Sequence, residues 1–123
     1  MIESIISMEL PAGGHLAIRR NRICPEQETK QCRRISLVSG IHGDELEGQY
    51  ICYETARRVK EHPEYLKGIV DIYPALNPLG IDMASRTVPR LEMDMNRMFP
   101  GDASGDMMER ITAAVVDSII GSD

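Results

Sequence analysis

Apolar and polar residues alternate in part over the first ten positions, and the pattern stops at Pro11, which Gly13 and Gly14 follow. Alternation that ends at proline and glycine predicts a strand that runs into a turn. Apolar residues recur over 16–23, in a second predicted strand. The first part of the chain is therefore expected to form a hairpin.

Three further segments have the patterns of a buried strand, a helix and another buried strand. The compact apolar run 34–40 ends at a glycine and predicts the first of these strands. Over 44–61, apolar residues recur at helical spacing, with acidic residues in the first turn and basic residues toward the end, which predicts a helix. The short apolar run 69–73 predicts the next strand. A strand, a helix and a strand within about forty residues indicate a βαβ unit with parallel strands and a right-handed crossover.

The segment 77–101 is a predicted long loop, with prolines and glycines at its two ends. Loops of this length inside compact domains are usually functional or disordered. A final helix is predicted over 106–120, where apolar residues share one face. Together these elements predict an α/β fold with a mixed, largely parallel sheet flanked by helices.

The composition is that of one globular domain of modest size. The chain has 123 residues, of which 42% are hydrophobic and 27% are charged, and domains typically hold roughly 100–200 residues. Its 14 Lys and Arg against 19 Asp and Glu give a net charge of −5, the wrong sign for binding phosphate backbones, so nucleic acid is not an expected partner. The arginines that come closest to a basic patch are interpreted as a solvated charged face: Arg19, Arg20, Arg22, Arg33 and Arg34.

Cysteine usage and hydropathy favour a cytoplasmic protein. The three cysteines are an odd number, and the N-terminus has no basic region ahead of an apolar stretch, so no signal peptide is predicted. Reduced thiols in the cytoplasm are the expected state. No apolar run approaches the length of about 18 residues that a membrane span needs, so no membrane association is expected.

His42 and Glu45 are the first candidate site residues, at the point where the predicted strand leads into the predicted helix. In helical geometry, residues i and i+3 have Cβ atoms about 5–6 Å apart, so an imidazole nitrogen and a carboxylate oxygen can bind one metal ion. The position of the pair after a strand also suits a binding site, because ligands of open α/β sheets bind beyond the carboxyl ends of the strands. Gly40 and Gly43 are expected to leave room for the metal and the substrate. Taken alone, the spacing is a weak motif that favours a histidine capping a helix over a metal ligand.

Four motifs carry a resemblance to a known family. They are, in order, Ser39-Gly40-Ile41-His42-Gly43-Asp44-Glu45, then Asn77-Pro78-Leu79-Gly80, then Arg86 with Pro89, and then the segment from Asp94 to Gly101. In this order and at these distances they resemble the succinylglutamate desuccinylase/aspartoacylase family, a branch of the zinc carboxypeptidase superfamily. The resemblance implies that residues 1–123 form a single, truncated catalytic domain, the N-terminal part of a zinc carboxypeptidase-like (phosphorylase/hydrolase-like) fold.

The resemblance implies a role for each matched polar residue. It makes His42 and Glu45 ligands of a zinc ion. It makes Arg86 the catalytic arginine that polarises the scissile carbonyl. It makes Asn96 and Arg97 the pair that holds the free carboxylate of the substrate. These roles suit the side chains, because a guanidinium grips a carboxylate through two parallel hydrogen bonds and stabilises an oxyanion beside a metal.

Two further residues of the segment 77–101 are weighed against these assignments. Arg90 competes with Arg86 for the catalytic role, because the distance from this arginine to the Asn-Arg pair varies among relatives. Asp94 is expected to be a structural residue whose hydrogen bonds orient the loop.

The same resemblance places a third metal ligand, a histidine, on a strand after the last helix and a catalytic glutamate further on, and this sequence contains neither. The expected function is a zinc-dependent hydrolase that cleaves the amide of an N-acyl amino acid or a related, peptide-like carboxylate, with this chain inactive alone. The alternatives are a non-catalytic module that binds a metal or a carboxylate and a purely structural domain.

An incomplete sheet leaves an edge and apolar helix faces uncovered, so self-association is expected.

Overall fold

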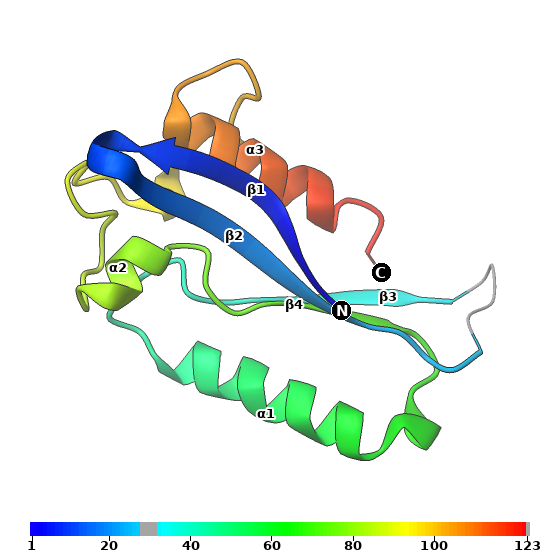
Figure 1. The fold of residues 1–123 in the computed structure, drawn as a ribbon. Helices are drawn as coiled ribbons and strands as arrows, with labels where there is room; N and C mark the ends of the chain where they lie inside the picture. Colours follow the sequence, from blue (N-terminus) through cyan, green and yellow to red (C-terminus); the bar gives the residue numbers. More distant parts are fainter. Residues whose placement is uncertain (28–31, 123) are drawn as a thin grey trace.

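The computed structural model describes residues 1–27 and 32–122. In these ranges the chain forms four strands and three α-helices (Figure 1). Every strand and both long helices that the sequence pattern predicts are confirmed, and one short helix is added. The elements are β1 (Ile2–Leu10), β2 (Gly14–Ile23), β3 (Arg34–Val38), α1 (Glu47–Glu61), β4 (Ile69–Tyr73), α2 (Pro78–Asp82) and α3 (Met107–Ile119).

The strands form one mixed sheet in the order β1-β2-β4-β3. The pairs β1/β2 and β2/β4 are antiparallel, while β3 and β4 are parallel. The prediction of a largely parallel sheet is therefore wrong, since only the βαβ unit β3-α1-β4 contributes a parallel pair. The second antiparallel pair arises because β2 is long enough for its last residues, 21–23, to run alongside β4.

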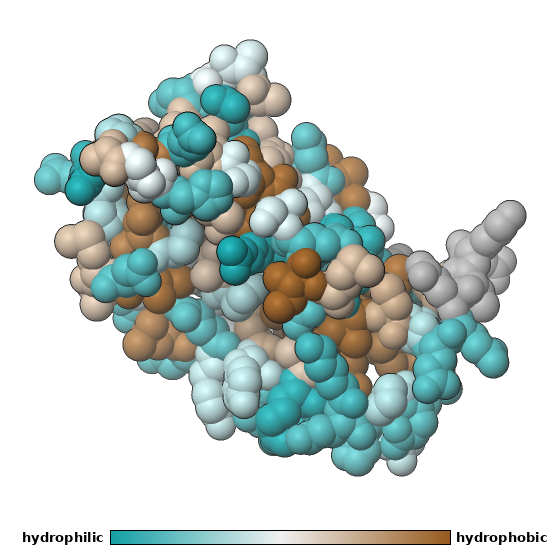
Figure 2. Space-filling view, viewed as in Figure 1, coloured by the Kyte–Doolittle hydropathy of each residue, from teal (hydrophilic) through white to brown (hydrophobic). Residues whose placement is uncertain are grey.

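The sheet lies between two helices, with α1 on one face and α3 on the other (Figure 1). The outer side of α1 is mostly hydrophilic, and hydrophobic residues show between α1 and the strands (Figure 2). The main core lies on the α3 side and consists of Leu16, Ile18, Tyr73, Leu76, Val88, Met95, Met108, Ile111 and Val115. Within residues 1–27 and 32–122, none of the helices has both the length and the apolar character that crossing a membrane requires.

The segment 77–101 is more ordered than the predicted long loop. It opens with α2, because the proline at position 78 suits the first helical position and the Asn77 side chain caps the helix, with Oδ1 accepting from the Gly80 N–H at 2.8 Å. Further along, Val88 and Met95 are buried in the core. The loop is therefore held against the sheet by its own apolar residues.

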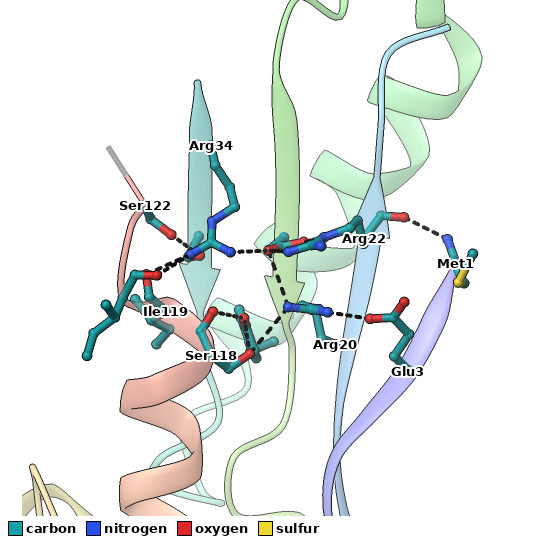
Figure 3. A network of polar contacts seen from close by, with 12 residues as sticks. Met1, Glu3, Arg20, Arg22, Arg34, Ser118, Ile119 and Ser122 are labelled. Carbon is teal, nitrogen blue, oxygen red and sulfur yellow. Dashed lines mark hydrogen bonds and ion pairs between the residues drawn. The ribbon is translucent and has the colours of Figure 1, made fainter. Parts of the chain in front are cut away.

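Three arginines of the supposed solvated face converge on one buried carboxylate (Figure 3). Asp71 on β4 is 0% exposed, and Arg22 holds both its oxygens, with Nε donating to Oδ1 at 2.8 Å and Nη2 to Oδ2 at 2.7 Å. Arg20 and Arg34 approach Oδ2 at 3.7 and 3.9 Å, and Arg20 also donates to Glu3. The solvated-face interpretation is wrong for these three arginines, because side chains of neighbouring strands meet on one face of the sheet.

The same cluster ties the end of α3 to the sheet. Arg34 Nη2 donates to the carbonyl oxygens of Ile119 and Ile120 at 3.1 and 2.6 Å, and carbonyl groups at a helix end lack partners within the helix. The Tyr73 hydroxyl donates to the Ser118 carbonyl at 3.2 Å. A positive charge at a helix C-terminus is also favourable in the field of the helix dipole. The buried aspartate therefore organises the arginines that fix where α3 ends.

We expect Asp71→Asn to destabilise the fold strongly, because it leaves three guanidinium groups facing one another without their shared carboxylate. Removing one partner of a buried ion pair typically costs about 3–5 kcal/mol. The free energy of unfolding from urea titration measures the effect. Glu61→Gln, which removes a carboxylate from an exposed ion pair with Arg57 on α1, is the control and should leave the urea midpoint almost unchanged. Equal effects of the two substitutions would contradict a special role for Asp71.

Candidate functional site

His42 and Glu45 lie in a turn between β3 and α1, at the end of the sheet where the parallel strands have their carboxyl ends. α1 begins at Glu47 rather than at the predicted position 44. The Glu45 N–H donates to the His42 carbonyl at 3.4 Å. The two side chains are close, as expected, but the turn brings them together and not the helical spacing.

The His42 ring is held between two carboxylates. Its Nδ1 lies 3.2 Å from Glu45 Oε1, its Nε2 lies 3.0 Å from Asp94 Oδ1, and the side chain is 10% exposed. When the neutral ring donates its hydrogen from Nε2 to Asp94, the lone pair of Nδ1 faces the Glu45 oxygen. Two acceptors in this arrangement repel each other unless a proton or a cation lies between them. One imidazole nitrogen and one carboxylate oxygen are a donor set that zinc accepts.

Asp94 has a larger part in the site than the sequence indicates. Its Oδ1 accepts the N–H of Asn96 at 3.0 Å, which orients the loop as expected. The hydrogen bond from His42, followed by that from the Asn96 backbone, holds the pKa of Asp94 below its ordinary value, so the carboxyl is ionised at neutral pH. The sequence did not predict the hydrogen bond between Asp94 and His42. Its only signal there is a carboxylate beside the Asn-Arg pair.

Arg86 is the arginine that reaches the pair. Its Nη1 donates to Glu45 Oε1 at 3.2 Å, although 54% of its side chain is exposed. Among the described residues, Arg90 forms no hydrogen bond or ion pair with His42 or Glu45; it lies in a turn between the bridged residues Val88 and Met93, with a φ of 71°. The geometry therefore favours Arg86 over Arg90.

Asn96 and Arg97 follow in a short turn that begins after Asp94. Both side chains are exposed, and the charge of Arg97 contributes to the lowered pKa of Asp94. Asn96 lines the same hollow as the two candidate ligands, which we call the β3–α1 hollow. Its lining consists of Val38, Ser39, Gly40, Ile41, His42, Glu45, Glu47, Gly48 and Asn96.

The segments that carry these residues are in direct backbone contact. An ideal Cβ on Gly43 would lie 2.0 Å from the carbonyl carbon of Gly80, and the Gly43 N–H donates to the Ser85 carbonyl at 2.9 Å. Gly43 was expected to leave room for metal and substrate, and this is wrong: the space beside it is filled by the backbone at the start of α2. The glycine is needed so that the two segments can touch.

The described residues bring together the two side chains that the sequence predicts as metal ligands. In the described part of the chain, no group of three or more His, Cys, Asp or Glu side chains is arranged to hold a metal ion. His42 and Glu45 are thus a pair of candidate ligands facing a hollow, with Asp94 behind the ring and Arg86 beside the carboxylate.

Comparison with known proteins identifies the family of the chain. The family model of the succinylglutamate desuccinylase/aspartoacylase catalytic domain matches residues 31–120. The chain belongs to this family. Among curated proteins, the N-alpha-acetyl-L-2,4-diaminobutyric acid deacetylase of Halomonas elongata is 36% identical over 75 residues, which are 61% of this chain and 21% of the deacetylase.

Solved structures of the family share the fold described above. A succinylglutamate desuccinylase/aspartoacylase from Rhodobacter sphaeroides is 32% identical with a TM-score of 0.73, and the match covers 90% of this chain and 33% of that one. The product-bound ectoine utilization protein from Ruegeria pomeroyi is 26% identical with a TM-score of 0.76, covering 96% of this chain and 35% of that one. The chain thus spans about a third of the length of these family members and about a fifth of the deacetylase.

We expect Gly43→Ala to destabilise the fold at the candidate site through packing alone. The added methyl group meets backbone, which cannot turn aside as a flexible side chain can, and overpacking typically costs about 1–3 kcal/mol. Thermal unfolding measures the loss. The matched control is Gly14→Ala, where the new carbon would meet the Leu10 side chain at 3.2 Å and little should change. A Gly43→Ala variant as stable as the parent would show that the contact with Gly80 is not required.

Proposed function

We propose that the chain supplies a pair of metal ligands and the substrate-binding arginines of a zinc-dependent hydrolase, which cleaves the amide bond of an N-acyl amino acid or a related carboxylate. The observation that carries the proposal is the continuous set of contacts from Asp94 through His42 and Glu45 to Arg86. It brings a guanidinium to the carboxylate of a candidate ligand pair, and that pair lines the β3–α1 hollow. Membership of the desuccinylase/aspartoacylase family supports the same reaction class.

His42 Nδ1 and a Glu45 oxygen would hold the zinc ion. Catalytic zinc sites have three protein ligands and keep a position for water or substrate, so the described residues provide two of the three. When bound, zinc polarises a carbonyl oxygen and lowers the pKa of its water. Asp94 accepts the Nε2 hydrogen of His42, and a carboxylate in that place fixes the orientation of the ring and makes the ligating nitrogen more basic.

Three loop residues act on the substrate in this proposal. Arg86 stabilises the negative charge that develops on the acyl carbonyl oxygen when the amide is attacked. Arg97 holds the free carboxylate through two parallel hydrogen bonds, and Asn96 adds a donor beside it. Recognition at two separate points selects a substrate with both an amide carbonyl and a carboxylate.

The relatives narrow the substrate class. One is named as a deacetylase of N-alpha-acetyl-L-2,4-diaminobutyric acid, and another is an ectoine utilization protein with product bound. An acetylated amino acid has the amide carbonyl for Arg86 and the carboxylate for Arg97. A small N-acyl amino acid is therefore the substrate class that we propose.

The second candidate is a non-catalytic module that binds a metal or a carboxylate. One observation favours it: among the described residues, no group of three or more His, Cys, Asp or Glu side chains is arranged to hold a metal ion. The hydrolase and a metal-binding module both predict zinc binding. Coding DNA that continues into a strand bearing a histidine would favour the hydrolase, and a stop codon directly after position 123 would favour the binding module.

We expect the chain to bind one zinc ion, with His42→Ala abolishing the binding because a two-ligand site cannot lose one ligand and persist. Isothermal titration calorimetry measures stoichiometry and affinity. Asp94→Asn leaves both ligands in place and should weaken binding about 10–100-fold, as loss of a carboxylate behind a ligating histidine usually does.

The control for the zinc titration is His15→Ala, which removes an exposed histidine of the hairpin that bonds to Ser7. It should leave zinc binding unchanged. Zinc binding that survives in His42→Ala would refute the assignment of the ligands. The chain alone should not hydrolyse N-acetyl amino acids, and robust turnover would contradict the need for a third ligand and a further glutamate.

We also expect the chain to associate with a second copy through the outer edge of β3. This strand ends the sheet order, and its Ile35 and Val38 are 55% and 40% exposed. Exposed strand edges pair with other chains, and lysine on an edge opposes this. Light scattering at micromolar concentration should show dimers or larger species, fewer of them in Val38→Lys. A monodisperse monomer would contradict the prediction.

A further inference from the structure

Asn77 is a buried polar residue between β4 and α2. Its role as the cap of α2 accounts for only one of its two side-chain hydrogen bonds. It is 1% exposed, and both ends of its amide group have partners. Oδ1 accepts from the Gly80 N–H at 2.8 Å, which caps α2. Nδ2 donates to the carbonyl oxygen of Thr87 at 3.2 Å, across ten residues of chain. Capping the helix requires only the first of these bonds.

The second bond fixes the backbone directly after Arg86. On the other side of Arg86, the Ser85 carbonyl accepts the Gly43 N–H at 2.9 Å, and Gly43 follows His42 in the chain. The peptide before Arg86 and the carbonyl group of the residue after it are therefore each anchored, one to the turn that carries the candidate ligands and one to Asn77.

The Arg86 side chain cannot hold this position by itself. It is 54% exposed, and its partner Glu45 is 60% exposed. Ion pairs between groups this accessible contribute little, because water competes for both charges and two long side chains must be ordered. The anchored backbone therefore limits which positions the guanidinium can reach.

Asn77 is also bound to the segment in front of the ligands, since its own N–H donates to the Gly40 carbonyl at 2.7 Å. We infer that Asn77 is a positioning residue, whose amide sets the distance between the His42/Glu45 pair and the Arg86 guanidinium by holding the Thr87 carbonyl. The inference rests on the proposed function, in which Arg86 acts on the acyl carbonyl of the substrate.

The variant that isolates this role is Asn77→Ser. Serine caps a helix as effectively as asparagine does. Its hydroxyl is too short to bond to the Thr87 carbonyl while it caps the helix. Asn77→Asp is a second variant that keeps the side-chain volume and the cap and loses the donor. The matched control is Ser85→Ala, which removes the other side-chain donor to the same carbonyl, the Ser85 hydroxyl at 3.1 Å.

The first measurement needs no metal. The ¹⁵N chemical shift of Arg86 Nε is compared in the parent chain, in the variants and in Glu45→Gln, which gives the value for an arginine without its partner. We expect Asn77→Ser and Asn77→Asp to move the signal toward that value and Ser85→Ala to leave it in place. A signal that stays unchanged in both Asn77 variants, or that moves equally in Ser85→Ala, would overturn the inference.

The second measurement separates positioning from stability. The zinc-loaded chain is titrated with N-acetylglycine, which has one amide carbonyl and one carboxylate. Asn77→Ser should leave zinc affinity unchanged and weaken N-acetylglycine binding about tenfold, since small displacements of a positioned group are costly. In a chain that already has Arg86→Ala, adding Asn77→Ser should cause no further loss of N-acetylglycine affinity, because Asn77 acts through Arg86.

The two measurements distinguish the two hypotheses. Suppose that Asn77→Ser shifts the Arg86 Nε signal but the parent chain binds no zinc. The positioning role of Asn77 is then supported, and the proposed hydrolase site is refuted. If N-acetylglycine binding falls by the same factor whether or not Arg86 is present, Asn77 has only a general structural role and the inference fails.

Discussion

The contact between the backbones of Gly43 and Gly80 is the constraint on which the site depends. At this point the turn after β3 and the start of α2 are too close for any side chain larger than hydrogen. The approach allows the Gly43 N–H to bind the Ser85 carbonyl, and Arg86 follows immediately. A contact that involves no functional group thus brings a guanidinium to the carboxylate of Glu45.

Strand β4 connects a stabilising cluster to this site. Its Asp71 is buried among arginines from β2 and β3, which fix the sheet and the end of α3. Six residues further on, the chain reaches Asn77, which binds both the Gly40 carbonyl and the Thr87 carbonyl. A rigid strand between the two means that the loops at its carboxyl end start from a fixed place, as catalytic loops on α/β sheets usually do.

Local patterns in the sequence are sufficient to predict most elements, while contacts between distant segments are not predictable from them. The strands, α1 and α3 follow from periodicity, and the closeness of His42 and Glu45 was predicted, although a turn and not helical spacing produces it. The antiparallel pairing of β2 with β4 and the meeting of Arg22 with Asp71, 49 residues apart, depend on tertiary packing. The same is true of the bond between His42 and Asp94, which are 52 residues apart. Such pairs leave no period or short motif in the chain, so burial of the arginines and the support behind the histidine appear only in the structure.

The exposure of the site has a consequence for its chemistry. His42 is almost covered, whereas Glu45 and Arg86 are more than half exposed. Two unit charges 4 Å apart attract by about 1 kcal/mol in bulk water and by about 4 kcal/mol at an effective dielectric constant of about 20. In the proposed hydrolase, the Arg86 guanidinium would therefore act several times more strongly on a developing oxyanion when the β3–α1 hollow is covered than when it is open. The described residues fix the positions of the charged groups, and whatever covers the hollow, substrate or further protein, determines how strongly those charges act.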